Sequence, residues 1–397
     1  MGKTTPFHSR TSALCKSNKW IDWGGYAVVD SYGVTHEEEY LAIRESTGMI
    51  DVSGLFKYRV RGRDAVPFVN RLITRDIRKC KIGQVFYTPL CDEEGKVTDE
   101  GPVLRYGENE FVFTMTRLLG RWLDEHAVGM DVTIEDESEP VATLALQGPT
   151  SRDLMKQVCD ADMDALKFWY FTRAKIAGVD VDISRTGYTG DLGYELWLPA
   201  ESAEKLWDVF MAEGKPFGLK PNGMLAMLTA RVEAGLIMME GDYISCHRAP
   251  IPELKYSPFE LGLDWTVKLE REGFIGREAL VEEKRKGSPR KLVGFIVDWD
   301  DYTRVHEAAG VKPELPIVPW GECERYALRL DGKRIGWATS AVWSPMIKQY
   351  VGFGTIETAH AQIGKKLHMD VEVGGEDKQV AVTQAKLPFY DPPRKRA

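Results

Sequence analysis

The chain has 397 residues, of which 43% are hydrophobic, and a formal net charge of −8. This length predicts two or three domains, each with its own core. The acidic balance, with no basic stripe in the body of the chain, argues against a nucleic-acid-binding protein, and the lack of an 18-residue apolar run argues against a membrane span.

The N-terminal segment has no apolar core of the kind that secretion signals carry. The six cysteines are scattered, and no two of them form a Cys-x-x-Cys pair. This usage is typical of free thiols in a reducing cytoplasm. Cys246 and His247 are adjacent, and adjacency is not a metal-ligand spacing. We therefore expect a cytoplasmic protein without a metal site.

Residues 57–134 form a block rich in predicted strands. Short apolar runs alternate there with Gly, Asp and Glu turns, which is typical of β structure. The runs begin at Tyr58, Val85, Pro102 and Phe111. Two helices are predicted within the block, over 63–72 and 117–126.

A mixed block follows from about residue 142 to residue 240. The sequence predicts a buried strand over Ala142–Gln147, and a helix with a serine N-cap over Ser151–Gln157. The segment 221–239 predicts a longer helix, because a proline stands at its start and apolar residues recur at helical spacing.

Two charged residues flank the apolar stripe of that longer helix. At about 100° per residue, Arg231 and Glu233 lie on opposite edges, so they point to one site only if the helix ends near Gly235. Charged residues at the edge of a helix are usually solvated. From the helix alone, a solvated flank is therefore the first interpretation of both residues.

A glycine-rich segment lies between two alternating stretches, 179–183 and 194–198, that predict strands. Its glycines recur at a period of three: Gly187, Gly190 and Gly193. Glycine tolerates positive φ and has no side chain, so such a loop lets the backbone approach a ligand closely. Tyr188 in the loop and Glu195 after it suit a flat, polar, heteroaromatic ligand. A glycine-rich hairpin without a ligand is the alternative.

The last part of the chain returns to short strands. Apolar runs that begin at Leu292, Tyr326, Arg334 and Tyr350, punctuated by Gly and Pro, predict a separate small β domain. The charged and turn-forming residues 282–289 predict the linker before it. The basic cluster 392–396 is expected to be a frayed, solvated tail.

Six sequence elements occur in a fixed order along the chain. They are 48–53, 144–149, 185–195, 231–235, the pair 257–267 and 274–280, and 336–345. In residue type and order they resemble the signatures of the glycine-cleavage T-protein (aminomethyltransferase) superfamily, whose members bind tetrahydrofolate. The run Arg-Thr-Gly-Tyr-Thr-Gly-Asp-Leu-Gly-Tyr-Glu over 185–195 is the most specific match, and the resemblance covers nearly the whole chain.

The resemblance implies an α+β fold in which three domains form a cloverleaf around a central folate channel. It implies tetrahydrofolate as the cofactor. The implied domains are a discontinuous folate-binding domain over 1–54 and 140–244, a second α+β domain over 55–139 and 245–285, and a C-terminal β-barrel domain over 286–397.

The resemblance also implies roles for individual residues. By motif position, Glu195 grips the pterin, whose amino group and ring N–H a carboxylate can accept together, and Tyr188 lies near the reacting carbon. The family's paired aspartates are Asp99 and Glu100 here. Asp99 is the expected catalytic acid, and a one-residue slip would select Glu100 instead. The other expected folate contacts are Tyr87, Arg231, Glu233, Gly187 and Gly190.

Two departures from the T-protein bear on the one-carbon donor. Ser53-Gly-Leu-Phe stands in place of Ser-His-Met-Gly, and Thr339-Ser-Ala in place of Thr-Ser-Gly. Other segments, among them 81–87 and 386–389, resemble the dimethylsulfoniopropionate demethylase branch. We therefore expect an enzyme that moves a methyl group from a small S-, N- or O-methylated substrate to N5 of tetrahydrofolate.

Two alternatives to this demethylase remain. The first is aminomethyl transfer from a lipoyl carrier protein, as in the T-protein, giving 5,10-methylene-tetrahydrofolate. The second is a non-catalytic folate-binding protein. The chain lacks the short reactive-cysteine motif of superfamily members that act in iron–sulfur cluster work, and Cys246-His-Arg does not match it. This weakens the non-catalytic alternative.

Overall fold

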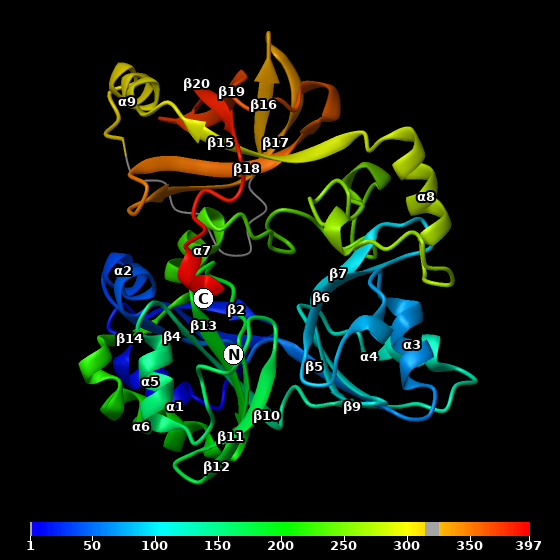
Figure 1. Cartoon of the computed structure of the whole chain (residues 1–397). Helices are drawn as coiled ribbons and strands as arrows, with labels where there is room; N and C mark the ends of the chain where they lie inside the picture. Colours follow the sequence, from blue (N-terminus) through cyan, green and yellow to red (C-terminus); the bar gives the residue numbers. More distant parts are fainter. Residues whose placement is uncertain (1, 314–324) are drawn as a thin grey trace.

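A computed structural model describes residues 2–313 and 325–397 of the protein. Of the cysteines, Cys323 lies outside these residues, and the other five are free thiols. The described residues form a small three-stranded sheet, a six-stranded sheet, a five-stranded sheet and a closed barrel. In Figure 1 the barrel lies at the top, the six-stranded sheet at the lower left and the five-stranded sheet at the right.

The six-stranded sheet has the order β11-β12-β13-β10-β4-β14. Its strands are antiparallel except that β14 runs parallel to β4. They span Phe171–Ile176 (β11), Val179–Ser184 (β12), Gly193–Pro199 (β13), Val141–Gln147 (β10), Thr47–Asp51 (β4) and Leu219–Asn222 (β14). The strands predicted over 142–147, 179–183 and 194–198 are confirmed.

Helices cover both faces of this sheet. The first face packs against α1 (His8–Leu14), α5 (Ser151–Val158) and α6 (Ala203–Glu213). The second face packs against α2 (Glu37–Glu45) and α7 (Met224–Glu233). Side chains alternate between faces along β10, so Leu144 and Leu146 meet the first group and Ala145 meets the second.

Two details of the predicted helices are wrong. The N-cap of α5 is Thr150, while Ser151 lies inside the helix and its hydroxyl donates to the carbonyl of Gly148 at 2.7 Å. The helix predicted over 221–239 is shorter, because its start pairs with β4 as strand β14 and its end is broken at Gly235, where φ is +64°.

The five-stranded sheet has the order β6-β7-β8-β5-β9 and packs against two helices. The strands span Val85–Cys91 (β6), Val97–Gly107 (β7), Glu110–Met115 (β8), Phe56–Arg61 (β5) and Thr133–Asp136 (β9). The two expected helices are confirmed with shifted starts, as Ala65–Leu72 (α3) and Gly120–Ala127 (α4).

The barrel closes in the order β15-β18-β17-β16-β19-β20. Its strands span Arg290–Val297 (β15), Gln349–Glu357 (β18), Lys333–Ser344 (β17), Tyr326–Leu330 (β16), Lys366–Val373 (β19) and Glu376–Ala385 (β20). The α+β fold with a C-terminal β-barrel is confirmed. Sequence patterns missed β19, β20 and α9 (Trp299–Ala308), and part of the predicted linker 282–289 belongs to α8 (Arg277–Lys286).

The remaining elements are short. The small sheet consists of Lys3–Thr4 (β1), Tyr26–Ser31 (β3) and Lys19–Trp23 (β2). Single 3-10 turns span Ile77–Lys79, Ala200–Ser202, Lys215–Phe217, Pro252–Leu254, Asp264–Thr266, Thr358–His360 and Pro393–Lys395. Within 2–313 and 325–397, no helix is long and apolar enough to cross a membrane.

The expectation of a frayed C-terminal tail is wrong. After β20 the chain leaves the barrel and returns to α7 and the six-stranded sheet, as the red end of the ribbon in Figure 1 shows. The backbone N–H groups of Phe389 and Tyr390 both donate to the carbonyl of Glu233 at 2.9 Å. Arg394 then pairs with Asp191 through two nitrogens, at 2.7 and 2.9 Å.

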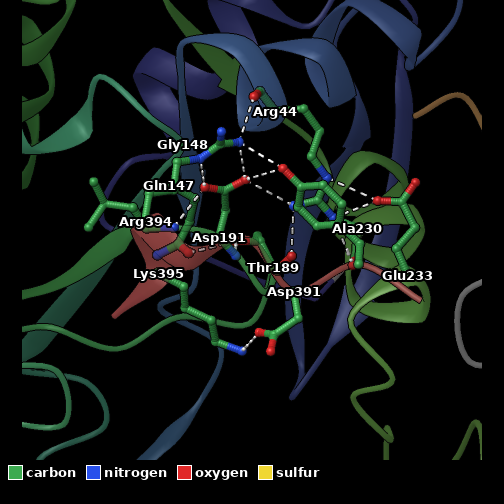
Figure 2. A network of polar contacts seen from close by, with 12 residues as sticks. Arg44, Gln147, Gly148, Thr189, Asp191, Ala230, Glu233, Asp391, Arg394 and Lys395 are labelled. Atoms are coloured by element: carbon green, nitrogen blue, oxygen red, sulfur yellow. Dashed lines mark hydrogen bonds and ion pairs between the residues drawn. The ribbon is translucent and has the colours of Figure 1, made fainter. Parts of the chain in front are cut away.

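The charged residues of α7 are buried in ion pairs, so the solvated-flank interpretation is wrong. Arg44 of α2 approaches Glu233 at 2.6 Å (Figure 2), and Arg231 approaches Asp242 at 2.6 Å. Arg231 also donates to the hydroxyl of Ser340 on β17 at 2.7 Å. One helix end is therefore fixed both to the six-stranded sheet and to the barrel.

We expect Glu233→Ala to destabilise the fold by about 3 kcal/mol, because removing one partner of a buried ion pair leaves the other charge undercompensated. Urea unfolding would measure the loss. Glu376→Ala is the matched control, since Glu376 pairs with Lys378 on the exposed barrel surface, where solvent screens the pair, and it should lower the free energy of unfolding far less. Equal effects of the two substitutions would contradict a structural role for the buried pair.

Candidate functional site

Three connected cavities lie where the sheets meet. An inner cavity of about 130 Å³ shares Tyr87, Pro102, Tyr188 and Glu195 with an outer cavity of about 460 Å³. Along a different wall, the inner cavity shares Trp23, Thr116, Met238 and Met239 with a third cavity of about 480 Å³. The inner cavity therefore lies between the two larger cavities and shares a wall with each.

The inner cavity is mostly apolar and contains two carboxyl groups. Its walls include Trp23, Leu55, Met115, Trp197 and Met227. Glu100 enters from β7 of the five-stranded sheet, and Glu195 from β13 of the six-stranded sheet. A concave apolar site with a few converging polar groups is the usual form of a small-molecule site.

The outer cavity has an aromatic wall. The ring of Tyr87 lies 6.2 Å from the ring of Trp169 and 6.2 Å from that of Trp265, and it is nearly parallel to the latter. Trp265 is 51% exposed, and Phe168 packs beside Trp169. Planar ligand groups stack well on such rings.

The adjacent acids of β7 have different surroundings. Glu100 lines the inner cavity, whereas Asp99 points away from it and accepts hydrogen bonds from the backbone N–H groups of Glu100 at 2.7 Å and Arg117 at 3.0 Å. Burial raises the pKa of Asp99 well above its ordinary value, and the neighbouring Glu100 raises it further. Successive strand residues face opposite sides of a sheet, which separates the two acids.

Glu100 is poised to titrate near neutral pH. Burial raises its pKa to about 7, although a hydrogen bond from the hydroxyl of Tyr87 favours the charged form. The buried hydroxyl of Tyr243 also faces Glu100 and, like that of Tyr87, favours its charged form. Glu100 is thus a carboxyl that can hold or release a proton inside an apolar cavity.

Glu195 is half-buried, and the Thr186 hydroxyl donates a hydrogen bond to its Oε2. Burial raises the pKa of Glu195, and the Thr186 hydrogen bond opposes this shift. Its other oxygen, Oε1, receives no hydrogen bond from the described residues. The carboxylate can therefore accept N–H donors from a ligand in the cavity.

The glycine segment places Tyr188 in the same cavity, with its hydroxyl donating to the carbonyl of Ile237. Protein packing accounts for the glycines. A Cβ on Gly187 or Gly193 would lie within 2.4 Å of the Gln147 side chain, and one on Gly190 would lie 2.3 Å from Ala234. Gly190 also has φ of +74°, which favours glycine.

The expected site residues therefore fall into two groups. Tyr87, Tyr188 and Glu195 line both the inner and the outer cavity, and Gly187 lines the outer one. Away from these cavity walls lie Asp99, Arg231, Glu233 and Gly190. The sequence analysis did not identify Tyr243 or Trp23 as site residues. The only sequence feature that could have indicated Tyr243 is its position shortly after α7, and none indicated Trp23.

No group of three His, Cys, Asp or Glu side chains within the described ranges is placed to bind a metal ion. The two carboxyls of the inner cavity accept hydrogen bonds from the phenol of Tyr87 and the hydroxyl of Thr186. Its chemistry is therefore that of proton transfer and of binding polar N–H groups.

Comparisons with known proteins agree over the whole chain. The profile of the GCVT N-terminal domain matches residues 8–271, and that of the glycine cleavage T-protein C-terminal barrel domain matches residues 290–391. An aminomethyltransferase from Caldanaerobacter subterraneus subsp. tengcongensis is 34% identical, with 88% of this chain and 87% of its own covered. One from Bacillus pumilus is 33% identical, with 98% and 99% covered.

A solved structure matches in fold. The glycine cleavage system aminomethyltransferase T from Bartonella henselae superposes with a TM-score of 0.82 and 23% sequence identity, over 98% of this chain and 99% of its own. The multidomain architecture around the cavities is therefore that of the T-protein fold.

We expect Glu100 to titrate near pH 7 in the folded protein, well above its ordinary 4.5. The folded state then binds an extra proton, so the contribution of Glu100 to the free energy of unfolding falls as pH rises from about 4.5 to about 7. Carbon-13 NMR of labelled glutamate carboxyls would measure the pKa, with Glu100→Gln to assign the signal.

Tyr87→Phe should raise the pKa of Glu100 further, because it removes a donor to the carboxylate. Titration of Glu100 near 4.5 would contradict its burial.

Proposed function

The chain belongs to the glycine cleavage T-protein family of folate-dependent one-carbon transferases, and on this basis we propose that it is an aminomethyltransferase. It would take the aminomethyl group from the sulfur of a lipoyl carrier protein. The products are 5,10-methylene-tetrahydrofolate, ammonia and the dihydrolipoyl carrier. The relatives described above are aminomethyltransferases, which favours this hypothesis over methyl transfer from a small methylated substrate.

The observation that best supports the proposal is the meeting of Glu100 and Glu195 in one small cavity that borders two larger ones. A transfer between two substrates needs both to reach the same space. One carboxylate would hold the acceptor, and the other would handle protons. Positioning of this kind supplies much of the rate of a transfer reaction.

The residues of the site fit tetrahydrofolate. Glu195 has one oxygen available for N–H donors, and the pterin edge offers an amino group beside a ring N–H. The aromatic wall formed by Tyr87, Trp169 and Trp265 suits the planar rings of the ligand. When bound, tetrahydrofolate supplies N5 as the nucleophile toward the aminomethyl carbon.

Glu100 is the proposed acid–base group, in place of the expected Asp99. A carboxyl with a pKa of about 7 is present in both protonation states at neutral pH, so it can take a proton from an amine and return one to a leaving group. The Tyr87 hydroxyl orients it by donating to Oε2. Asp99, on the opposite side of β7, would have a structural role through the hydrogen bonds that it accepts from backbone N–H groups.

The third cavity is the proposed approach for the lipoyl arm. Its wall contains Arg117 and Arg248, whose guanidinium groups both lie near Glu240 at 3.3 and 3.4 Å. Arg248 is 60% exposed, and the adjacent Leu118 is 68% exposed. Asp22 and Glu240 line the same cavity, so its rim offers charges of both signs and an exposed apolar side chain to the carrier and its hydrophobic arm.

The test is a donor comparison with tetrahydrofolate as the acceptor. We expect aminomethylated lipoyl carrier protein to yield 5,10-methylene-tetrahydrofolate and ammonia, both quantified by mass spectrometry or enzymatic assay. Glu100→Gln should slow this turnover about a hundredfold, because the variant cannot exchange a proton. If sulfonium, N-methyl or aryl-methyl-ether donors gave 5-methyl-tetrahydrofolate instead, the protein would be a demethylase.

We expect Glu195→Gln to weaken tetrahydrofolate binding at least about tenfold, because the amide replaces one charged acceptor with a donor. Isothermal titration calorimetry measures this directly and does not require turnover. Glu278→Gln, an 85% exposed site on α8, is the control and should bind like the parent. Unchanged binding by Glu195→Gln would remove Glu195 from the folate site.

A further inference from the structure

The C-terminal tail, residues 386–397, is joined to the glycine segment by an ion pair that the reaction itself does not require. We propose that Arg394 is a positioning residue, which fixes the glycine segment so that Tyr188 and Gly187 form the wall of the folate site. The proposal rests on the proposed function only in taking tetrahydrofolate as the ligand.

The residues that follow the cavity-facing part of the glycine segment anchor it in the protein, in addition to the Tyr188 hydroxyl contact with the Ile237 carbonyl. Tyr188 and Gly187 face the cavities, while Thr189 and Asp191 turn into the protein. The Thr189 hydroxyl donates to Gln147 at 2.7 Å, and the Thr189 carbonyl accepts from Arg44 at 2.9 Å. The placement of the cavity wall therefore depends on the contacts made two or three residues further along the chain.

Asp191 is the principal anchor of the segment. Its side chain is fully buried and lies between two arginines that come from opposite ends of the chain, as Figure 2 shows. Arg44 reaches Oδ2 at 3.4 Å, whereas Arg394 reaches Oδ1 at 2.7 Å and Oδ2 at 2.9 Å. The two-point contact from Arg394 fixes the plane of the carboxylate, which the single, longer contact from Arg44 does not.

Arg394 is itself held in place by the tail. One of its nitrogens donates to the Tyr390 hydroxyl at 2.7 Å and to the Arg44 carbonyl at 3.0 Å. The ring of Tyr390 lies under the Arg44 guanidinium at 4.3 Å, and its backbone N–H is bound to the Glu233 carbonyl. The tail thus presents a preorganised guanidinium to a residue 203 positions earlier in the sequence.

The same tail forms part of the outer cavity, through Leu387, Pro388, Lys395 and Arg396. Its docking therefore completes two walls of the folate site at once. One wall is built by the tail directly, and the other is fixed through Asp191. A tail that left its place would open the outer cavity and loosen the glycine segment together.

Removing Arg394 should loosen the segment more than it destabilises the whole fold, because Asp191 keeps its contacts with Arg44 and with the Tyr390 hydroxyl, and Glu233 keeps its pair with Arg44. The side chain of Arg394 is 37% exposed, so its loss leaves no large buried void. This makes the substitution suitable for separating a local effect from a global one.

The experiment compares Arg394→Ala and Arg394→Lys in the full chain. We expect Arg394→Ala to raise the KM for tetrahydrofolate about tenfold, with a much smaller change in kcat and none in the KM for the donor. Arg394→Lys should recover part of the loss, since lysine keeps the charge but not the two-point contact. Hydrogen–deuterium exchange of peptides covering 185–192 should become faster in Arg394→Ala.

Arg329→Ala is the matched control, because Arg329 makes a similar two-point pair with Asp370 on the barrel surface. It should alter neither the KM nor exchange in 185–192. An unchanged KM and unchanged local exchange in Arg394→Ala would overturn the proposal, as would faster exchange throughout the chain. If the parent protein failed to bind tetrahydrofolate, the proposed function would fall, while the exchange comparison would still decide whether Arg394 fixes the segment.

Discussion

The buried ion pairs at the end of α7 are the interaction on which the rest of the structure depends. Arg44 of α2 pairs with Glu233 of α7 and with Asp191 of the glycine segment, and Arg394 pairs with Asp191. Arg231 and Asp242 pair with each other and contact Ser340 of the barrel, which joins the barrel to the same helix. Charges removed from water need partners with good geometry, so each pair fixes the relative positions of the elements it joins. The cavities lie between parts that these pairs hold together.

The inner cavity combines an apolar wall with carboxyls of different character. Glu195 has an oxygen free for ligand N–H groups, whereas Glu100 is held by a phenol and has a pKa raised to about 7. Burial gives Glu100 its proton affinity, because a low-dielectric wall disfavours the charged form. The carboxylate proposed to bind folate and the carboxyl proposed to transfer protons therefore differ through their surroundings.

Local patterns predicted many of the strands and the helices α3, α4, α5 and α7, because alternation and helical spacing record which face of an element is buried. They failed where long-range contacts decide the outcome. Pro221 does not begin a helix, because its segment pairs with β4. Arg394 does not lie in a frayed tail, because it pairs with Asp191, which stands 203 residues earlier in the chain. The order of Asp99 and Glu100 along a strand could not tell which of them faces the cavity.

The sequence by itself determined the family, the α+β character with its terminal barrel, and the glycine segment with Tyr188 and Glu195. These follow from short-range spacing and from motifs in a fixed order. Only the tertiary structure decided that Glu100 and not Asp99 lines the cavity, and that Arg231 and Glu233 are structural ion-pair residues. The physical reason is that burial, and with it pKa and charge pairing, is set by neighbours far away in the sequence.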